Sequence, residues 1–201
     1  IRWQSKKERQ MSRKDPLESE NEKDDQDPFH TLGLDTHQNL LKSRIILLNG
    51  DVKENIIERA AIPLIKFTDG NKAQKPVQIL LNSFGGNMED AQAVIDIMRT
   101  TKTHIVTKVL GKAMSAAFDI FLAGDKRIIY PNTILMCHAG GTAMAYKPLP
   151  YYNDEAKLFS QMYDRWATFY ASRTKISKKE WLDIITSGKD RYFLADEALE
   201  K

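Results

Sequence analysis

From about residue 40 onward, the sequence alternates short apolar runs with amphipathic stretches of helical length. Short apolar runs bounded by turn residues are typical of strands, and apolar positions three and four residues apart are typical of helices that bury one face. Repeated units of this kind predict an α/β protein. The expected strands are 44–48, 77–81, 104–110, 127–130 and 134–138, and the expected helices are 52–69, 88–100, 113–123, 154–172 and 177–187.

The N-terminal residues have a different composition. Residues 1–14 hold six basic side chains and one acid, whereas residues 15–27 hold seven acidic side chains and one base. Half of residues 1–30 are charged, so burial could not offset the chain entropy that ordering removes. We therefore expect a mobile or partner-ordered arm over residues 1–37 and a single folded domain over 38–201. A basic patch for nucleic acid or an acidic mimic is the alternative interpretation of this arm.

The remaining composition narrows the class of protein. The net charge of +3 is too small to indicate a nucleic-acid partner without a concentrated basic face. No stretch reaches the roughly 18 apolar residues of a membrane span. The single cysteine, Cys137, excludes an internal disulfide and a multi-cysteine metal site. We expect a cytoplasmic protein; the alternatives are an organellar protein and a phage-encoded protein in the host cytoplasm. A sequence that begins at Ile1 is compatible with a true start that lies upstream.

A strand that runs into Gly85-Gly86 and then a helix is the strongest local feature. Two consecutive glycines free backbone N–H groups to point at a ligand, and such a nest binds developing negative charge. The alternative is an ordinary strand-to-helix turn. Without a third glycine or a Lys-Ser/Thr pair, the segment is neither a dinucleotide fingerprint nor a P-loop.

Ser115 is the candidate nucleophile. Residues 111–118 read Gly-Lys-Ala-Met-Ser-Ala-Ala-Phe, which places a hydroxyl in the first turn of a helix among small neighbours. The helix dipole there favours an oxyanion. The alternative is that Ser115 caps the helix or packs in a tight interface.

A serine nucleophile needs a base, and one of the four histidines is well placed. His138 ends an apolar strand, where period-two alternation puts it on the face opposite Cys137. We interpret Cys137 as a buried small hydrophobe. A satisfied core histidine is the alternative for His138. The pattern leaves the orienting acid open among Asp183, Asp190 and Asp196.

Five motifs occur in the order seen in ClpP peptidases, and the resemblance covers residues 38–201. They are residues 41–50, 81–86, 111–118, 136–138 and 190–194. The resemblance implies a ClpP/crotonase-like spiral of β-β-α units with a protruding long helix. It also implies heptameric rings, stacked in pairs, that enclose the active sites and are fed by a AAA+ unfoldase of the ClpX, ClpA or ClpC type. It implies no cofactor, no metal and no nucleic-acid or membrane partner.

The same resemblance implies roles for individual residues. Ser115 would be the nucleophile of a serine endopeptidase, His138 its base and Asp190 the residue that orients the base. The oxyanion hole would be built around Gly85, Gly86 and Ala116, with the N–H groups of Gly86 and Ala116 as donors.

The sequence departs from the ClpP pattern at several positions. Phe84 stands where the family usually has proline, Ala116 where methionine is frequent, and Ala139-Gly140 where glutamine and proline commonly follow the histidine. The departures keep every catalytic side chain and favour a divergent member. The alternatives are a phage head-maturation protease of the same fold, a catalytically silent ring subunit and a crotonase-like acyl-CoA enzyme.

Overall fold

The computed structural model describes residues 28–69, 75–141 and 148–201. Leu40–Lys201 form one compact unit. Helix α1 (Pro28–Lys42) comes before it in the sequence, with Pro28 at its first position, where a fixed φ favours a helix. Residues 1–27 of the expected charged arm lie outside the described residues. Residues 28–37 are helical, and the apolar pattern does not predict this helix.

A six-stranded mixed sheet forms the centre of the compact unit. Its order is β1 (Ile45–Asn49), β2 (Val77–Ser83), β3 (Ile105–Met114), β5 (Ile134–Cys137) and β6 (Arg191–Leu194), and β4 (Lys126–Ile128) also pairs with β3. All pairings are parallel except that of β5 with β6. Buried and half-buried residues alternate along β2, as expected of a strand that packs against helices with one face.

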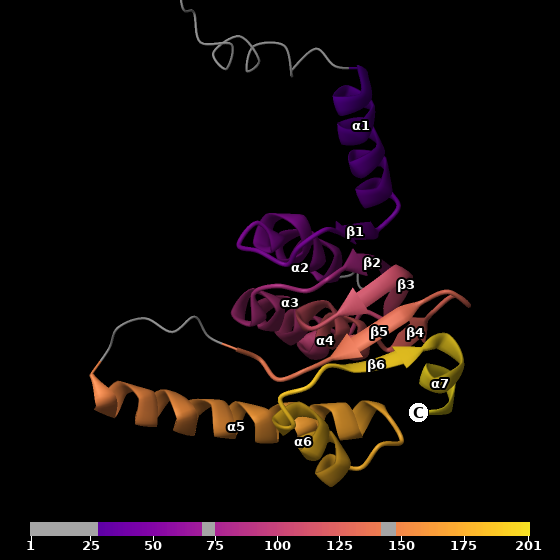
Figure 1. The fold of residues 1–201 in the computed structure, drawn as a ribbon. Helices are drawn as coiled ribbons and strands as arrows, with labels where there is room; N and C mark the ends of the chain where they lie inside the picture. The colour runs from indigo at the N-terminus through magenta and orange to yellow at the C-terminus, as the bar shows by residue number, and fades with distance from the viewer. Residues whose placement is uncertain (1–27, 70–74, 142–147) are drawn as a thin grey trace, which may run out of the picture. The chain divides into compact units, whose positions relative to one another are not determined.

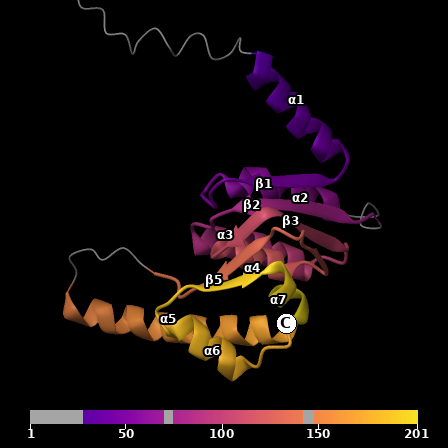
Figure 2. The ribbon, with the colours of Figure 1, turned by 45° about the vertical axis from the view of Figure 1, so that its right-hand side comes forward.

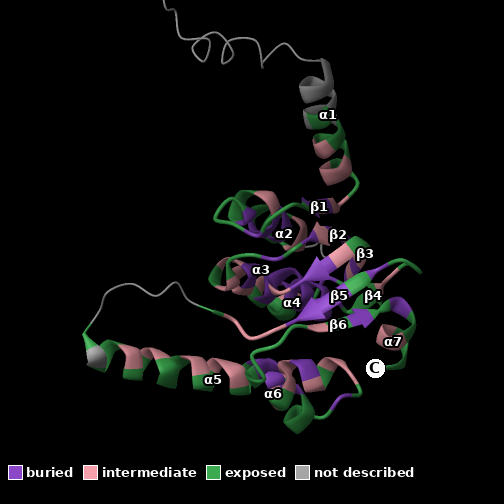
Figure 3. Ribbon diagram, viewed as in Figure 1, coloured by how far each residue is buried: buried purple, intermediate pink, exposed green. Residues whose placement is uncertain are grey.

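Helices α2 (Ile62–Thr68), α3 (Met88–Thr100) and α4 (Ala116–Ala123) cover the buried face of the sheet (Figures 1 and 2). Every residue of α4 is buried, and this helix packs on both β3 and α3. Figure 3 shows the buried residues concentrated in these layers. The hydrophobic core therefore lies directly behind the turn that contains Ser115.

Helix α5 (Leu149–Arg173) extends beyond the sheet with its N-terminal half, as Figures 1 and 2 show. Its C-terminal half is buried at Trp166, Ala167 and Tyr170 and packs against α4 and α6 (Lys178–Thr186). Ser177 caps α6 by accepting a hydrogen bond from the Glu180 N–H at 3.2 Å. The expected α/β class and the protruding long helix are thus confirmed.

An aromatic cluster joins the C-terminal elements to α4. Phe118 stacks on Phe193 of β6 at 6.3 Å between ring centroids, and Tyr170 of α5 meets Trp181 of α6 edge to face at 5.1 Å. Phe118 also contacts Tyr170 and Trp181. Packing of this kind fixes the start of β6, next to Asp190, relative to the start of α4.

Three expected helix starts are wrong, and one of them is that of α5, which is expected at residue 154 and begins at Leu149. The helix expected over residues 52–69 begins only near residue 56, with a π-helical turn (Ile57–Ala61) before α2, because Val52 forms a parallel bridge with Gly86 instead. The helix expected from residue 113 begins at Ala116, because β3 continues to Met114. Two short elements, β6 and α7 (Ala195–Glu200), are not predicted by the sequence pattern.

Candidate active site

Ser115 lies in a strained turn between β3 and α4. Its backbone has φ 51° and ψ −128°, a conformation that residues other than glycine rarely adopt. Backbone strain of this kind is concentrated at functional sites. The turn is held because the Ser115 N–H donates to the Met136 carbonyl at 2.8 Å and the Ser115 carbonyl accepts from the Phe118 N–H at 2.8 Å. The hydroxyl is thereby presented at the start of a buried helix.

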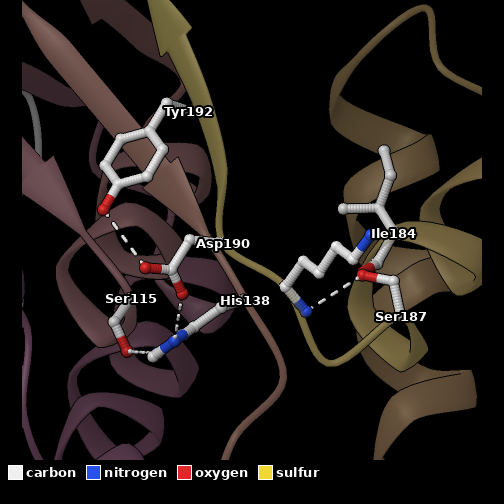
Figure 4. Close-up of polar contacts among 7 residues, drawn as sticks. Ser115, His138, Ile184, Ser187, Asp190 and Tyr192 are labelled. Atoms are coloured by element: carbon white, nitrogen blue, oxygen red, sulfur yellow. Dashed lines mark hydrogen bonds and ion pairs between the residues drawn. The ribbon is translucent and has the colours of Figure 1, made fainter.

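The structure brings Ser115, His138 and Asp190 together in one chain of contacts (Figure 4). Ser115 Oγ lies 2.8 Å from His138 Nε2, and His138 Nδ1 lies 3.2 Å from Asp190 Oδ1. Among the described residues, Asp190 is the carboxylate that contacts His138; Asp183 lies on α6 and Asp196 on α7. The side chains of His138 and Asp190 are 36% and 47% exposed, so solvent reaches the carboxylate end of this row of three side chains.

Tyr192 is a fourth member of this chain that the sequence analysis missed. Its hydroxyl donates to Asp190 Oδ2 at 3.1 Å (Figure 4). The hydrogen bond with Asp190 and the negative charge of that carboxylate raise the pKa of Tyr192 above its usual value, so the phenol keeps its proton. Residues two apart on an extended segment share a face, and this spacing is the signal that could have identified Tyr192.

The two glycines after β2 pass close to the Ser115 turn. A Cβ on Gly85 would lie 2.5 Å from the Met114 carbonyl oxygen and 2.7 Å from Ser115 Cβ, and one on Gly86 would lie 2.1 Å from the Val52 carbonyl oxygen. Both glycines also have positive φ. Only glycine fits at either position.

Backbone N–H groups of Gly86 and Ala116 are directed differently from that of Gly85. The Gly85 N–H donates to Ser83 Oγ at 3.0 Å and is therefore occupied. Val52 bonds to Gly85 and Asn87, so strand alternation turns the N–H of the intervening Gly86 away from Val52. Ala116 is the first residue of α4, where an N–H has no acceptor within its helix.

A cleft of about 420 Å³ opens beside Ser115 and His138. Its apolar lining comes from two parts of the chain. Phe84 and Met88 come from the end of β2 and the start of α3, and Phe159, Met162 and Trp166 come from α5. A second cavity of about 380 Å³ is lined by Phe118, Trp181 and Phe193 and includes none of the three polar residues. The first cleft is therefore the one in which a substrate would meet Ser115.

The segment after His138 is attached to α5. The Tyr163 hydroxyl donates to the Gly140 carbonyl at 2.9 Å, and a Cβ on Gly140 would lie 3.2 Å from the Trp166 ring. Tyr163 and Trp166 also contact each other, with ring centroids 5.6 Å apart. This arrangement stabilises a backbone that has glycine where ClpP peptidases commonly have proline.

A buried carboxyl group lies behind the Ser115–His138 pair. Asp119 and Cys137 line a small pocket of about 10 Å³ together with both residues. Burial raises the pKa of Asp119 to about 7, although a hydrogen bond from the Tyr170 hydroxyl opposes the shift. Burial and the charge of Asp119 raise the pKa of the Cys137 thiol well above its ordinary value. Cys137 is therefore a protonated thiol and a poor nucleophile, as its interpretation as a hydrophobe requires.

Within residues 28–69, 75–141 and 148–201, no group of three or more His, Cys, Asp or Glu side chains is arranged to hold a metal ion. Of the helices that the structure describes, none combines the length and apolar character needed to cross a bilayer.

Comparison with known proteins identifies the family. A model of Clp proteases matches residues 30–201. The chain belongs to the Clp protease family. Two relatives are ATP-dependent Clp protease proteolytic subunits from Streptococcus gordonii and Streptococcus pneumoniae, each 34% identical over 112 residues. These matches cover 54% of this chain and 57% of each relative, so the chain spans little more than half the length of the curated relatives it matches. The match to the Clp protease model confirms the resemblance seen in the motifs.

Proposed function

We propose that this chain is a serine endopeptidase subunit in which Ser115 is the nucleophile, His138 the general base and Asp190 the residue that orients the base. The observation that carries the proposal is the continuous contact from Ser115 Oγ to His138 Nε2 at 2.8 Å and from His138 Nδ1 to Asp190 Oδ1 at 3.2 Å. Membership of the Clp protease family supports it.

The chemistry follows from these contacts. His138 takes the proton of Ser115 Oγ as the oxygen attacks the carbonyl carbon of a peptide bond. The carbonyl oxygen becomes negative, and the N–H groups of Gly86 and Ala116 stabilise that charge. His138 then gives its proton to the leaving amine, and an ester remains on Ser115. A water molecule, deprotonated by His138, hydrolyses the ester and releases the acid product. Asp190 accepts a hydrogen bond from Nδ1–H and stabilises the imidazolium.

The proposal extends to assembly and to a partner. Relatives are named as proteolytic subunits of ATP-dependent proteases, which supports an assembly of several subunits that uses ATP. The assembly that we propose consists of heptameric rings stacked in pairs in the cytoplasm, with a AAA+ unfoldase that delivers unfolded protein to the chamber. The protruding part of α5 carries exposed apolar side chains such as Leu158, which is 55% exposed. Apolar surface of this kind is typical of a helix that is covered by another subunit.

Active-site labelling and peptide hydrolysis test the proposal. A fluorophosphonate probe should label the wild-type protein and the Ser160→Ala variant, in which an exposed serine of α5 is removed, but not Ser115→Ala. Hydrolysis of short peptides should follow the same pattern. Equal hydrolysis by wild type and Ser115→Ala would refute the catalytic role, and an unlabelled Ser115 in a folded protein that binds acyl-CoA would favour the crotonase-like alternative.

Assembly and partner have separate tests. The native mass should correspond to rings of seven or fourteen subunits in the family's manner, and a stable monomer would contradict a closed chamber. Degradation of a folded substrate protein should require the unfoldase and ATP. Processing of a capsid or scaffold protein without ATP would favour a head-maturation protease instead.

A further inference from the structure

Phe84 is an exposed aromatic ring inside the reaction cleft. It lies between β2 and Gly85, is 65% exposed, and lines the same cleft as Ser115 and His138. A large apolar side chain that remains exposed is unremarkable when it is isolated, but an exposed ring in a cleft beside reactive groups offers apolar area that a ligand can cover. Phe84 is therefore a candidate for direct contact with a substrate.

A cation lies over the ring of Phe84. Lys112 Nζ lies 4.1 Å from the centroid of the Phe84 ring, a distance at which an ammonium group is attracted by the face of the ring. Lys112 comes from β3 and also donates to Asn82 Oδ1 at 3.4 Å, while Asn82 Nδ2 donates to Asn49 Oδ1 at 2.8 Å. This polar row crosses three neighbouring strands, so the ammonium group has a defined place behind the ring.

The position of this pair differs from that of the apolar residues on α5. Phe159, Met162 and Trp166 line the cleft from α5, where Trp166 also packs against Gly140. Phe84 lines it from the β2–α3 segment, two residues before Gly86. A peptide bound with its scissile carbonyl at Gly86 and Ala116 would thus find two separate apolar walls. One side chain next to the scissile bond would face α5 and another would face Phe84.

We propose that Phe84 and Lys112 form a specificity subsite that binds one aromatic or aliphatic side chain of the substrate and rejects a basic one. The inference rests on the proposed peptidase function. The ring supplies apolar contact area, which favours an uncharged side chain that covers it. Lys112 lies over the ring and not in the lining of the cleft, which includes the exposed carboxylate of Glu89. The positive charge of Lys112 disfavours a lysine or arginine side chain stacked on that ring relative to an uncharged one.

Peptide hydrolysis by the purified full chain tests the subsite. The substrates are short fluorogenic peptides that carry phenylalanine, alanine or lysine at each of the two positions that flank the cleaved bond. The measured quantity is the ratio of kcat/KM between two peptides. At one flanking position only, wild type should favour phenylalanine over alanine, and Phe84→Ala should lower that ratio about tenfold. Phe84→Leu, which keeps an apolar side chain, should retain most of the preference.

The charge is tested separately with Lys112→Gln. This variant should raise kcat/KM for the lysine peptide relative to the alanine peptide about fivefold at that same position. Lys108→Gln is the matched control, because Lys108 also lies on β3, whereas the cation over the Phe84 ring is Lys112. Tyr130→Ala, which removes an exposed ring outside the cleft, is the control for Phe84→Ala. Both controls should leave the ratios at wild-type values.

The outcomes separate this inference from the proposed function. If wild type cleaves none of the peptides and Ser115 is not labelled by fluorophosphonate, the peptidase function fails and the subsite fails with it. If wild type cleaves them and every variant is labelled, but the ratios of Phe84→Ala and Lys112→Gln equal those of the controls, the subsite alone is refuted.

Discussion

Replacing Asp119 by asparagine should change how the stability of the protein depends on pH. Asp119 is buried, and its described contacts include the Tyr170 hydroxyl but no basic side chain. Burial raises its pKa from 3.8 to about 7. Between those two values, the folded protein holds a proton that the unfolded chain has released. The contribution of this group to stability therefore falls as the pH rises from about 4 to about 7 and is constant above that.

The size of the effect follows from the same two values. A pKa difference of about 3 at roughly 1.36 kcal/mol for each pH unit corresponds to about 4 kcal/mol of unfolding free energy. Asparagine still offers an oxygen to the Tyr170 hydroxyl but does not titrate. The difference in unfolding free energy, wild type minus Asp119→Asn, should therefore fall by about 4 kcal/mol between pH 4 and pH 8.

Urea unfolding at several pH values, followed by tryptophan fluorescence at one protein concentration, measures this difference. Subtraction of the variant removes the contribution of groups that titrate alike in both proteins. Asp96→Asn, which changes an exposed carboxylate on α3, is the control and should leave the pH dependence of wild type. A difference between wild type and Asp119→Asn that stays constant across this range would refute the argument, because it would mean that folding does not change the ionisation of Asp119.

Two further predictions concern the groups around the nucleophile. Tyr192→Phe removes the donor to Asp190 Oδ2, so kcat should fall about two- to fivefold with little change in KM, measured by steady-state peptide hydrolysis. Gly86→Ala places a Cβ 2.1 Å from the Val52 carbonyl oxygen, which breaks the bridge that directs the Gly86 N–H. Its kcat should fall at least about 100-fold, and thermal unfolding should show a loss of about 2 kcal/mol.

Matched variants show which results would contradict these two predictions. Tyr130→Phe removes a hydroxyl from an exposed ring outside the cleft and should keep wild-type kinetics. If the kcat of Tyr192→Phe equals that of Tyr130→Phe, the contact with Asp190 has no role in catalysis. Gly33→Ala adds a Cβ in helix α1 where no atom lies within 4 Å. A Gly86→Ala protein as active and stable as Gly33→Ala would contradict the account of the two glycines.

The sequence pattern predicts the main layers because the apolar periods are long enough to separate strands from helices. It is wrong at 52–55, where residues that continue a helical period instead form the bridge of Val52 with Gly86. A single bridge depends on a partner more than thirty residues away and leaves no local signal. The pattern also misses β6, because four residues with one buried side chain give too little alternation to recognise a strand.

The candidate site, like the fold, is predicted by the sequence pattern only in part. Ser115 and His138 stand out because each lies at the end of an apolar run, and the structure brings them within hydrogen-bonding distance. The choice of Asp190 among three acids came from the resemblance, since its contact with His138 spans 52 residues of chain. That the Gly85 N–H is taken by Ser83 Oγ depends on one side-chain rotamer, which no sequence pattern specifies.

Burial of Cys137 makes the protein's one thiol an internal reporter. The side chain is 1% exposed and lies in the pocket shared by Ser115 and His138. A thiol-reactive dye can therefore reach it only when β5 and α5 separate locally or the whole domain opens. The rate of modification measures how often this region opens in the native protein, without the introduction of any probe, and substrate or inhibitor bound beside Ser115 should slow it.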